Sequence, residues 1–138
     1  MKPLYTAVAT AHGGREGQVR SSDGVVELPL KMPKELGGPG GQATNPEQLF
    51  AAGYAACFES ALRLVARMQQ KQLKDAHITA HVTIGQTEDK GFGLAVELQG
   101  KIEGLGQPEA QALMEAAHQV CPYSKATRGN IQVKLTAL

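Results

Sequence analysis

The apolar residues in the second half of the chain alternate with polar ones at the period of a β-strand. They occupy every second position over residues 78–84, and the pattern repeats at Leu94, Val96, Leu98 and Ile102. After Pro108 the spacing changes, and apolar residues up to Cys121 recur as on one face of a helix. Residues 131–135 then alternate again. Because strands repeat every two residues and helices every 3.6, the pattern predicts two strands, a helix and a last strand.

The first half of the chain alternates more weakly. We expect strands over residues 4–10 and 25–30, with a hairpin turn at Ser21–Gly24, since an Asp-Gly pair favours tight hairpins. Residues 37–44 contain too many glycines for regular structure and predict a loop.

A long apolar helix is predicted directly after this loop. Asn45 suits the N-cap, Pro46 the first helical position, and Gln48 could complete a capping box. The following residues 49–68 are apolar on nearly every side. Such a helix has to be enclosed by protein, and a chain of this size is too small to enclose it alone. We therefore expect a homodimer.

The predicted order of elements is three strands, a helix, two strands, a helix and a strand. Clean alternation, rather than solid apolar runs, is typical of antiparallel sheets. We expect an α+β fold of antiparallel sheets around buried helices. Neither an internal repeat nor a linker interrupts it, so residues 1–138 are predicted to be one domain.

Composition narrows the choice of partners. The chain is 42% apolar and 20% charged, with a net charge of +1 and no basic stripe, which argues against nucleic acid. The most apolar stretch, residues 49–65, contains Glu59 and Arg63 and is expected to fall short of a membrane span. The first residues lack the features of a signal peptide. We expect a cytoplasmic protein with no membrane partner.

The two cysteines, Cys57 and Cys121, are the candidates for chemistry. They form no CxxC motif, and no histidine is spaced to complete a zinc site. His77 and His81 would lie about 13 Å apart along a strand, too far to share a metal. We expect no bound metal or cofactor. In a reducing compartment the two thiols are either inert or a working redox pair, and a core of packed helices could bring them together.

Three stretches resemble the organic hydroperoxide resistance (Ohr) branch of the Ohr/OsmC family. They are GGREG at residues 13–17, GGPGGQATNPEQLFAAGYAACF at residues 37–58 and CPYSKATRGNI at residues 121–131. Their order is that of the family, and the CPYS context favours the Ohr branch over its OsmC relatives. The resemblance implies an intertwined homodimer with active sites at the subunit interface.

The resemblance also implies a role for four residues. Cys57 would be the peroxidatic cysteine that attacks an organic hydroperoxide, and Cys121 the resolving cysteine that closes a disulfide onto it. Arg15 would be the guanidinium beside the thiolate, and Glu47 the carboxylate that holds this guanidinium. The reductant implied for the disulfide is an external dithiol, the dihydrolipoyl group of a lipoyl-bearing protein.

Two structural expectations follow from these roles. Glu47 and Cys57 would lie about 15 Å apart along one straight helix, so we expect an interruption or kink near Ala52–Tyr54, with Gly53 as its site. Phe50, Tyr54 and Phe58 are expected to form an apolar lining that favours alkyl hydroperoxides.

Two other function classes remain open. A buried helix wrapped by antiparallel strands is also typical of hot-dog-type thioesterases, which would not need paired cysteines. A non-catalytic redox sensor or ligand-binding protein could use the same pocket.

Overall fold

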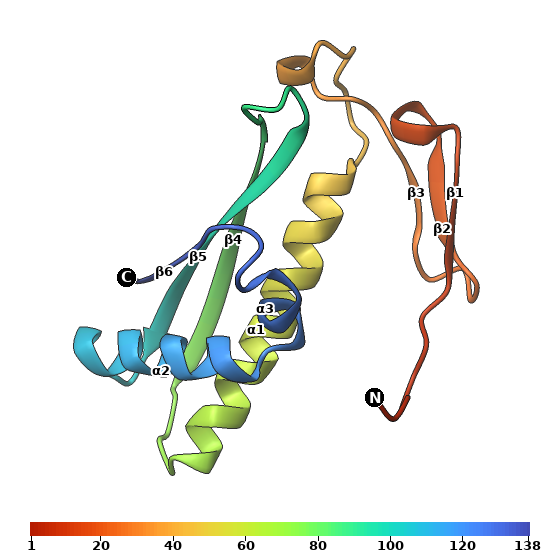
Figure 1. Ribbon diagram of the computed structural model, residues 1–138. Helices are drawn as coiled ribbons and strands as arrows, with labels where there is room; N and C mark the ends of the chain where they lie inside the picture. Colours follow the sequence, from red (N-terminus) through yellow and green to blue (C-terminus); the bar gives the residue numbers. More distant parts are fainter. The chain divides into compact units, whose positions relative to one another are not determined.

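The computed structural model describes residues 1–138, and the chain divides into two units, Met1–Leu49 and Phe50–Leu138. Each unit contains a three-stranded sheet (Figure 1). The order of the predicted strands and helices is the observed one, with one additional short helix and two 3-10 turns. The expectation of a single domain stays a prediction.

The first unit is an antiparallel sheet of β1 (Ala9–His12), β2 (Gln18–Ser21) and β3 (Glu27–Pro29). The predicted hairpin joins β2 to β3. In its turn, the Asp23 carboxylate accepts a hydrogen bond from the backbone N–H of Val25, and Gly24 adopts a φ of 75°. β1 begins later than predicted, and the apolar residues before it are not buried within the first unit, with Leu4 92% exposed.

The long helix α1 (Pro46–Met68) begins at the predicted cap. The Asn45 side chain accepts a hydrogen bond of 2.8 Å from the backbone N–H of Gln48. The reciprocal half of the capping box does not form, because the Gln48 side chain accepts from the Thr44 hydroxyl instead. Pro46 occupies the first helical position, where it has no N–H to leave unpaired.

The predicted interruption of α1 near Ala52–Tyr54 is wrong. The helix runs unbroken for 23 residues. Gly53 serves another purpose, because a Cβ atom there would lie 2.9 Å from the hydroxyl oxygen of Tyr123 and 3.3 Å from two of its ring carbons. The glycine therefore makes room for an aromatic ring against the helix, and a single glycine costs a helix only about 1 kcal/mol relative to alanine.

The second unit contains a sheet in the order β4 (Asp75–Gln86), β5 (Phe92–Glu103), β6 (Val133–Ala137). β4 and β5 form the predicted antiparallel hairpin. One pairing departs from an all-antiparallel sheet, since β6 runs parallel to β5. A parallel neighbour requires a crossover connection, and α2 (Gln107–Val120) and α3 (Pro122–Thr127) provide it.

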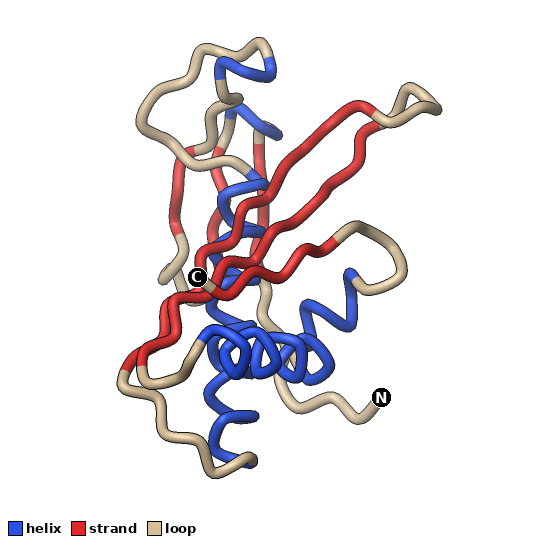
Figure 2. The backbone as a smooth tube through the Cα atoms, turned by 90° about the vertical axis from the view of Figure 1, so that its left-hand side faces the viewer, coloured by secondary structure: helices blue, strands red, loops and turns tan.

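Helices cover one face of this sheet (Figure 2). Alternate residues of β5, from Val96 to Ile102, are buried, whereas their neighbours Glu97 and Lys101 face away from the core. The buried cluster joins this face to the inner sides of α1 and α2. At its centre the absence of a side chain on Gly100 lets Met114 of α2 reach the strand.

α1 also meets, by length and composition, the requirements for crossing a membrane. Core helices of water-soluble proteins meet the same requirements, so the expectation that residues 49–65 fall short of a membrane span stays a prediction. Tyr54, Phe58 and Leu62 are nevertheless fully buried against the rest of the second unit. This packing is that of a core helix.

Candidate active site

The two cysteines meet in the core of the second unit. Cys57 lies in the middle of α1, and Cys121 lies between α2 and α3. Their sulfur atoms are 3.6 Å apart, and both are free thiols. Cys121 is fully buried and Cys57 is half-buried. The Cys57 thiol is thus accessible enough to attack a small molecule, and the Cys121 thiol lies buried next to it.

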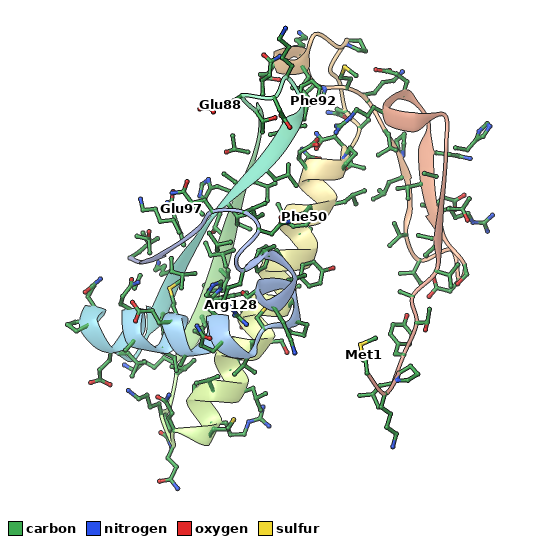
Figure 3. All side chains as sticks on the ribbon, viewed as in Figure 1. Met1, Phe50, Glu88, Phe92, Glu97 and Arg128 are labelled. Atoms are coloured by element: carbon green, nitrogen blue, oxygen red, sulfur yellow. The ribbon has the colours of Figure 1, made fainter.

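The local sequence explains why Cys121 sits at a corner of the chain. Its backbone is extended, with φ −61° and ψ 124°, and it closes α2 and opens α3 at once. Pro122 disfavours helical backbone at the residue before it, and it cannot donate a hydrogen bond that would continue α2. Beyond the corner, the side chain of Arg128, which is labelled in Figure 3, donates a hydrogen bond of 2.8 Å to the carbonyl oxygen of His118. This contact holds the end of α3 to the last turn of α2.

Three influences act on the Cys57 thiol. Burial raises its pKa above the ordinary value for a cysteine. A hydrogen bond from the backbone N–H of Tyr123 opposes this rise, because it stabilises the thiolate. The adjacent Cys121 raises the pKa of Cys57 further, since two touching sulfurs do not readily carry negative charge together. The balance is a raised pKa, so the second unit alone leaves Cys57 mostly protonated at neutral pH.

The first unit contains a two-bonded ion pair between Arg15 and Glu47. The guanidinium donates from Nη1 to Oε2 over 2.8 Å and from Nη2 to Oε1 over 2.7 Å. Glu47 lies in the first turn of α1 and is 14% exposed, against 32% for Arg15. The hydrogen bonds from Arg15 lower the pKa of the Glu47 carboxyl, and those to Glu47 raise the pKa of Arg15. The pair is therefore fully ionised at neutral pH.

Glycines on both sides allow the tight turn that presents Arg15. The turn is a 3-10 helix, Gly14–Glu16. Gly13 before it has a φ of 83°, and a Cβ atom on Gly17 after it would lie 1.7 Å from the carbonyl oxygen of His12. Only glycine fits the second position, which explains the composition of the GGREG stretch.

The four predicted site residues thus form two close pairs, each within its own unit. Arg15 contacts Glu47 in the first unit, and Cys57 contacts Cys121 in the second. The role of Arg15 beside Cys57 stays a prediction. No group of three His, Cys, Asp or Glu side chains lies close enough together to hold a metal ion.

Sequence reasoning missed a buried cluster of hydroxyl groups next to the thiols. The Tyr54 hydroxyl is 2.9 Å from Ser124 Oγ and 3.0 Å from Thr127 Oγ1, and all three side chains are buried. The available signal was spacing, since Ser124 and Thr127 follow Cys121 by one and two helical turns. The cluster joins α1 to α3.

An apolar pocket of about 460 Å³ opens beside α3. Its lining residues are Phe50, Leu94, Pro122, Tyr123, Ala126, Thr127, Asn130 and Ile131. Of the three aromatic residues expected to line a substrate pocket, only Phe50 does so. Tyr54 and Phe58 are fully buried in the core, because their helical positions face the sheet and α3.

Comparison with known proteins gives a consistent result. The family model described as OsmC-like protein matches residues 38–136. The chain is 55% identical to the organic hydroperoxide resistance protein of Xanthomonas axonopodis pv. citri, over 98% of this chain and 95% of the relative. It is 54% identical to the organic hydroperoxide resistance protein OhrA of Bacillus subtilis, with 97% and 96% covered.

A solved structure shares the fold over the same extent. The crystal structure of an organic hydroperoxide resistance protein from Legionella pneumophila superposes with a TM-score of 0.93 at 59% identity. The match covers 99% of this chain and 98% of that one.

Proposed function

This chain belongs to the OsmC-like protein family, in its organic hydroperoxide resistance branch, and on that premise we propose that it reduces organic hydroperoxides to alcohols with its two cysteines. Relatives of more than 50% identity carry the name of organic hydroperoxide resistance. The observation that carries the proposed mechanism is the pair of free thiols 3.6 Å apart, one reachable and one buried.

In the first step the Cys57 thiolate attacks one oxygen of the hydroperoxide. The O–O bond breaks, Cys57 becomes a sulfenic acid, and the other oxygen leaves as an alkoxide that takes up a proton to give the alcohol. Attack needs the thiolate, and burial has raised the pKa of Cys57. A fixed positive charge is therefore needed near this sulfur.

We propose that Arg15 supplies this charge and also acts on the leaving group. Lowering a cysteine pKa from about 8.5 to about 6 raises the thiolate fraction about 30-fold at pH 7, but the lost nucleophilicity cancels about 10- to 20-fold of that gain. Hydrogen bonds from the guanidinium to the departing oxygen supply the larger share of catalysis. The two bonds from Arg15 to Glu47 keep the guanidinium aimed.

The unbroken helix bears on which chain supplies that arginine. Glu47 and Cys57 are ten residues apart on α1, a rise of about 15 Å. This separation favours a homodimer in which the Arg15–Glu47 pair of one protomer serves Cys57 of its partner. The exposed side of α1, with Ala52, Ala56 and Leu64, and the exposed apolar residues of the first unit provide the surface for such a partner. The latter include Leu4, Tyr5, Val8 and Val25.

Cys121 completes the cycle. Its thiol condenses with the Cys57 sulfenic acid, forming the disulfide and releasing water. An external dithiol then reduces the disulfide by exchange and is itself oxidised to a disulfide. A dihydrolipoyl group on a partner protein fits this role, because its two thiols close a ring within one molecule. A cycle of this kind suits the cytoplasm, where thiols are kept reduced.

Mass spectrometry of the intact chain tests the proposal. Cumene hydroperoxide at one equivalent should remove both thiols with the loss of two hydrogens, and dihydrolipoamide should restore them. A Cys57→Ser variant should lose turnover, and Cys121→Ser should complete one turnover and then accumulate sulfinic acid. Full turnover by Cys57→Ser would exclude Cys57 as the nucleophile, and thiols that survive the peroxide would favour a thioesterase or a ligand-binding protein.

A further inference from the structure

We propose that Tyr54, Ser124 and Thr127 are positioning residues that hold Cys121 against Cys57 and so decide whether oxidised Cys57 is captured as a disulfide or lost by overoxidation. The inference rests on the proposed peroxidase function and adds a determinant of its second step. None of the three side chains takes part in the chemistry. Each acts indirectly, through the placement of α3.

One assignment of the hydroxyl hydrogens gives each of them an acceptor. Thr127 Oγ1 lies 3.2 Å from the carbonyl oxygen of Ser124, which can only accept, so the Thr127 hydroxyl donates there. The contact between Tyr54 and Thr127 then requires the Tyr54 hydroxyl to donate. The Ser124 hydroxyl in turn donates to Tyr54. Each hydroxyl hydrogen has one acceptor, and the three form a closed, directional network.

The position of the network relative to the thiols gives it its function. Tyr54 precedes Cys57 by three residues on α1, so the two side chains lie on the same side of the helix. Ser124 and Thr127 belong to α3, the six-residue helix that begins directly after Cys121. A helix this short is not stable by itself. The buried hydroxyl bonds therefore fix α3, and with it Cys121, to the part of α1 that carries Cys57.

Capture of the sulfenic acid depends on this placement. Condensation of Cys57 with Cys121 competes with attack by a second hydroperoxide molecule on the sulfenic acid, which gives sulfinic acid and another alcohol. Condensation is fast only while the sulfurs remain in contact, as they are at 3.6 Å. When α3 is less firmly held, the two sulfurs spend less time in contact, and a larger fraction of Cys57 is overoxidised to sulfinic acid.

The test is a Tyr54→Phe variant, with the exposed Tyr5→Phe as a matched control. The phenylalanine keeps the ring and removes the donor and acceptor, leaving Ser124 and Thr127 without their partner. At equal excess of cumene hydroperoxide, we expect the sulfinic fraction per turnover to rise about five- to tenfold, the equivalent of one lost hydrogen bond. The rate of the first turnover should stay within about twofold of the wild type, since Tyr54 does not contact the peroxide. Tyr5→Phe should match the wild type.

A second pair of variants separates positioning from general destabilisation. Thr127→Ser keeps the hydroxyl and should retain the wild-type sulfinic fraction, whereas Thr127→Val removes it and should raise that fraction. A raised sulfinic fraction in both, or in neither, would overturn the proposal, as would a Tyr54→Phe variant that lost thermal stability with an unchanged fraction.

A third measurement does not depend on peroxide. In a dithiothreitol redox buffer, the equilibrium constant for forming the Cys57–Cys121 disulfide should fall several-fold in Tyr54→Phe, because the two thiols are held together less of the time. An unchanged or increased constant would contradict the inference. If the wild type forms the disulfide in this buffer but does not consume peroxide, the proposed function fails; if Tyr54→Phe behaves as the wild type in both assays, only the positioning role fails.

Discussion

Cys57 occupies a site that is poor for a negative charge and good for a neutral substrate. Burial and the neighbouring Cys121 both raise its pKa, and only the Tyr123 N–H opposes them within the second unit. The same partly buried surroundings would favour the binding of an apolar hydroperoxide. In the proposed mechanism, this conflict at a single sulfur would require a strong and well-oriented cation.

Replacing Arg15 by lysine tests the requirement for a guanidinium. A lysine keeps the charge but cannot make the two parallel bonds to Glu47 or present a planar pair of donors to the leaving oxygen. We expect kcat/KM for tert-butyl hydroperoxide to fall by about a hundredfold or more. Arg20→Lys, at an exposed residue of β2 that pairs loosely with Glu27, is the control and should have little effect. An Arg15→Lys variant within threefold of the wild type would exclude the proposed role.

The pH dependence of stability reports on Glu47. Because Arg15 lowers the pKa of Glu47 in the folded chain, the pair stabilises the fold above the ordinary glutamate pKa of about 4.3, and this contribution is lost as the pH falls through the lower folded value. The difference in Tm between the wild type and Glu47→Gln should therefore be largest near neutral pH and should decrease as the pH falls below about 4. Glu88→Gln, at an exposed position in the β4–β5 turn, is the matched control and should change Tm little. A difference in Tm between wild type and Glu47→Gln that did not shrink from pH 7 to pH 3 would contradict this reading.

At the scale of single residues, sequence reasoning succeeded where a residue type has few uses. The Asn45 cap and the Asp-Gly turn were predictable because short-range hydrogen bonding alone selects those residues. The contact of the two thiols needed the fold to bring them together. The Tyr54 network was missed because the sequence predicted Tyr54 to be an apolar lining residue, and its hydroxyl partners lie 70 or more positions away along the chain.

At the scale of elements, glycines decide how closely helices approach their neighbours. The prediction of a kink at Gly53 was wrong because a glycine in a helix can serve a contact rather than a bend, and the sequence does not reveal which. The parallel β6 was missed for a related reason, since alternation identifies a strand but not the direction of its neighbour.

Gly100 offers a clean test of such a contact. A Cβ atom there would lie 2.6 Å from the sulfur of Met114, which is fully buried and has little room to move. We expect Gly100→Ala to reduce the free energy of unfolding by about 1–3 kcal/mol. Gly85→Ala is the matched control on β4, because its added methyl would meet nothing within 4 Å, and it should be neutral or stabilise by about 0.5–1 kcal/mol. Urea unfolding of both variants measures the two free energies of unfolding. Equal changes in Gly100→Ala and Gly85→Ala would contradict the packing argument.

At the scale of the whole molecule, the question is what covers the apolar surface that one chain leaves open. The composition of α1 predicted a second copy, and the homodimer stays a prediction. The partner itself could not be placed from sequence, because no pattern within one chain encodes the contacts between two.

A charge on the open side of α1 should separate the protomers. Ala56 is exposed in the single chain, so aspartate at this position would be harmless to a monomer but would be buried in the proposed interface. Sedimentation of the wild type should give twice the chain mass of 14.6 kDa. The Ala56→Asp substitution should shift the measured mass towards that of a single chain. Gln119→Glu, an added charge on an exposed position of α2, should leave the dimer intact. A monomeric wild type would remove the basis for the shared site.

Mixing two inactive variants tests whether the arginine comes from the partner. A dimer of one Arg15→Lys chain and one Cys57→Ser chain would hold one complete site if the arginine acts across the interface, and none if it acts within its own chain. After unfolding and refolding together, the mixture should recover about a quarter of wild-type activity, because half the dimers are mixed and one of their two sites is complete. No recovery, with mixed dimers shown by native mass spectrometry, would place both residues in one chain.

The wide separation of the two thiols along the chain has an energetic consequence. A disulfide across 64 residues removes loop entropy from the unfolded chain that is worth about 4 kcal/mol. By linkage, the fold stabilises the disulfide by the same amount, which resists reduction by about a thousandfold. A monothiol such as glutathione would be a weak reductant for this bond, and a low-potential dithiol would be the fitting one. In the proposed cycle, the contact that would let the disulfide form quickly would thereby also restrict which molecules can reduce it.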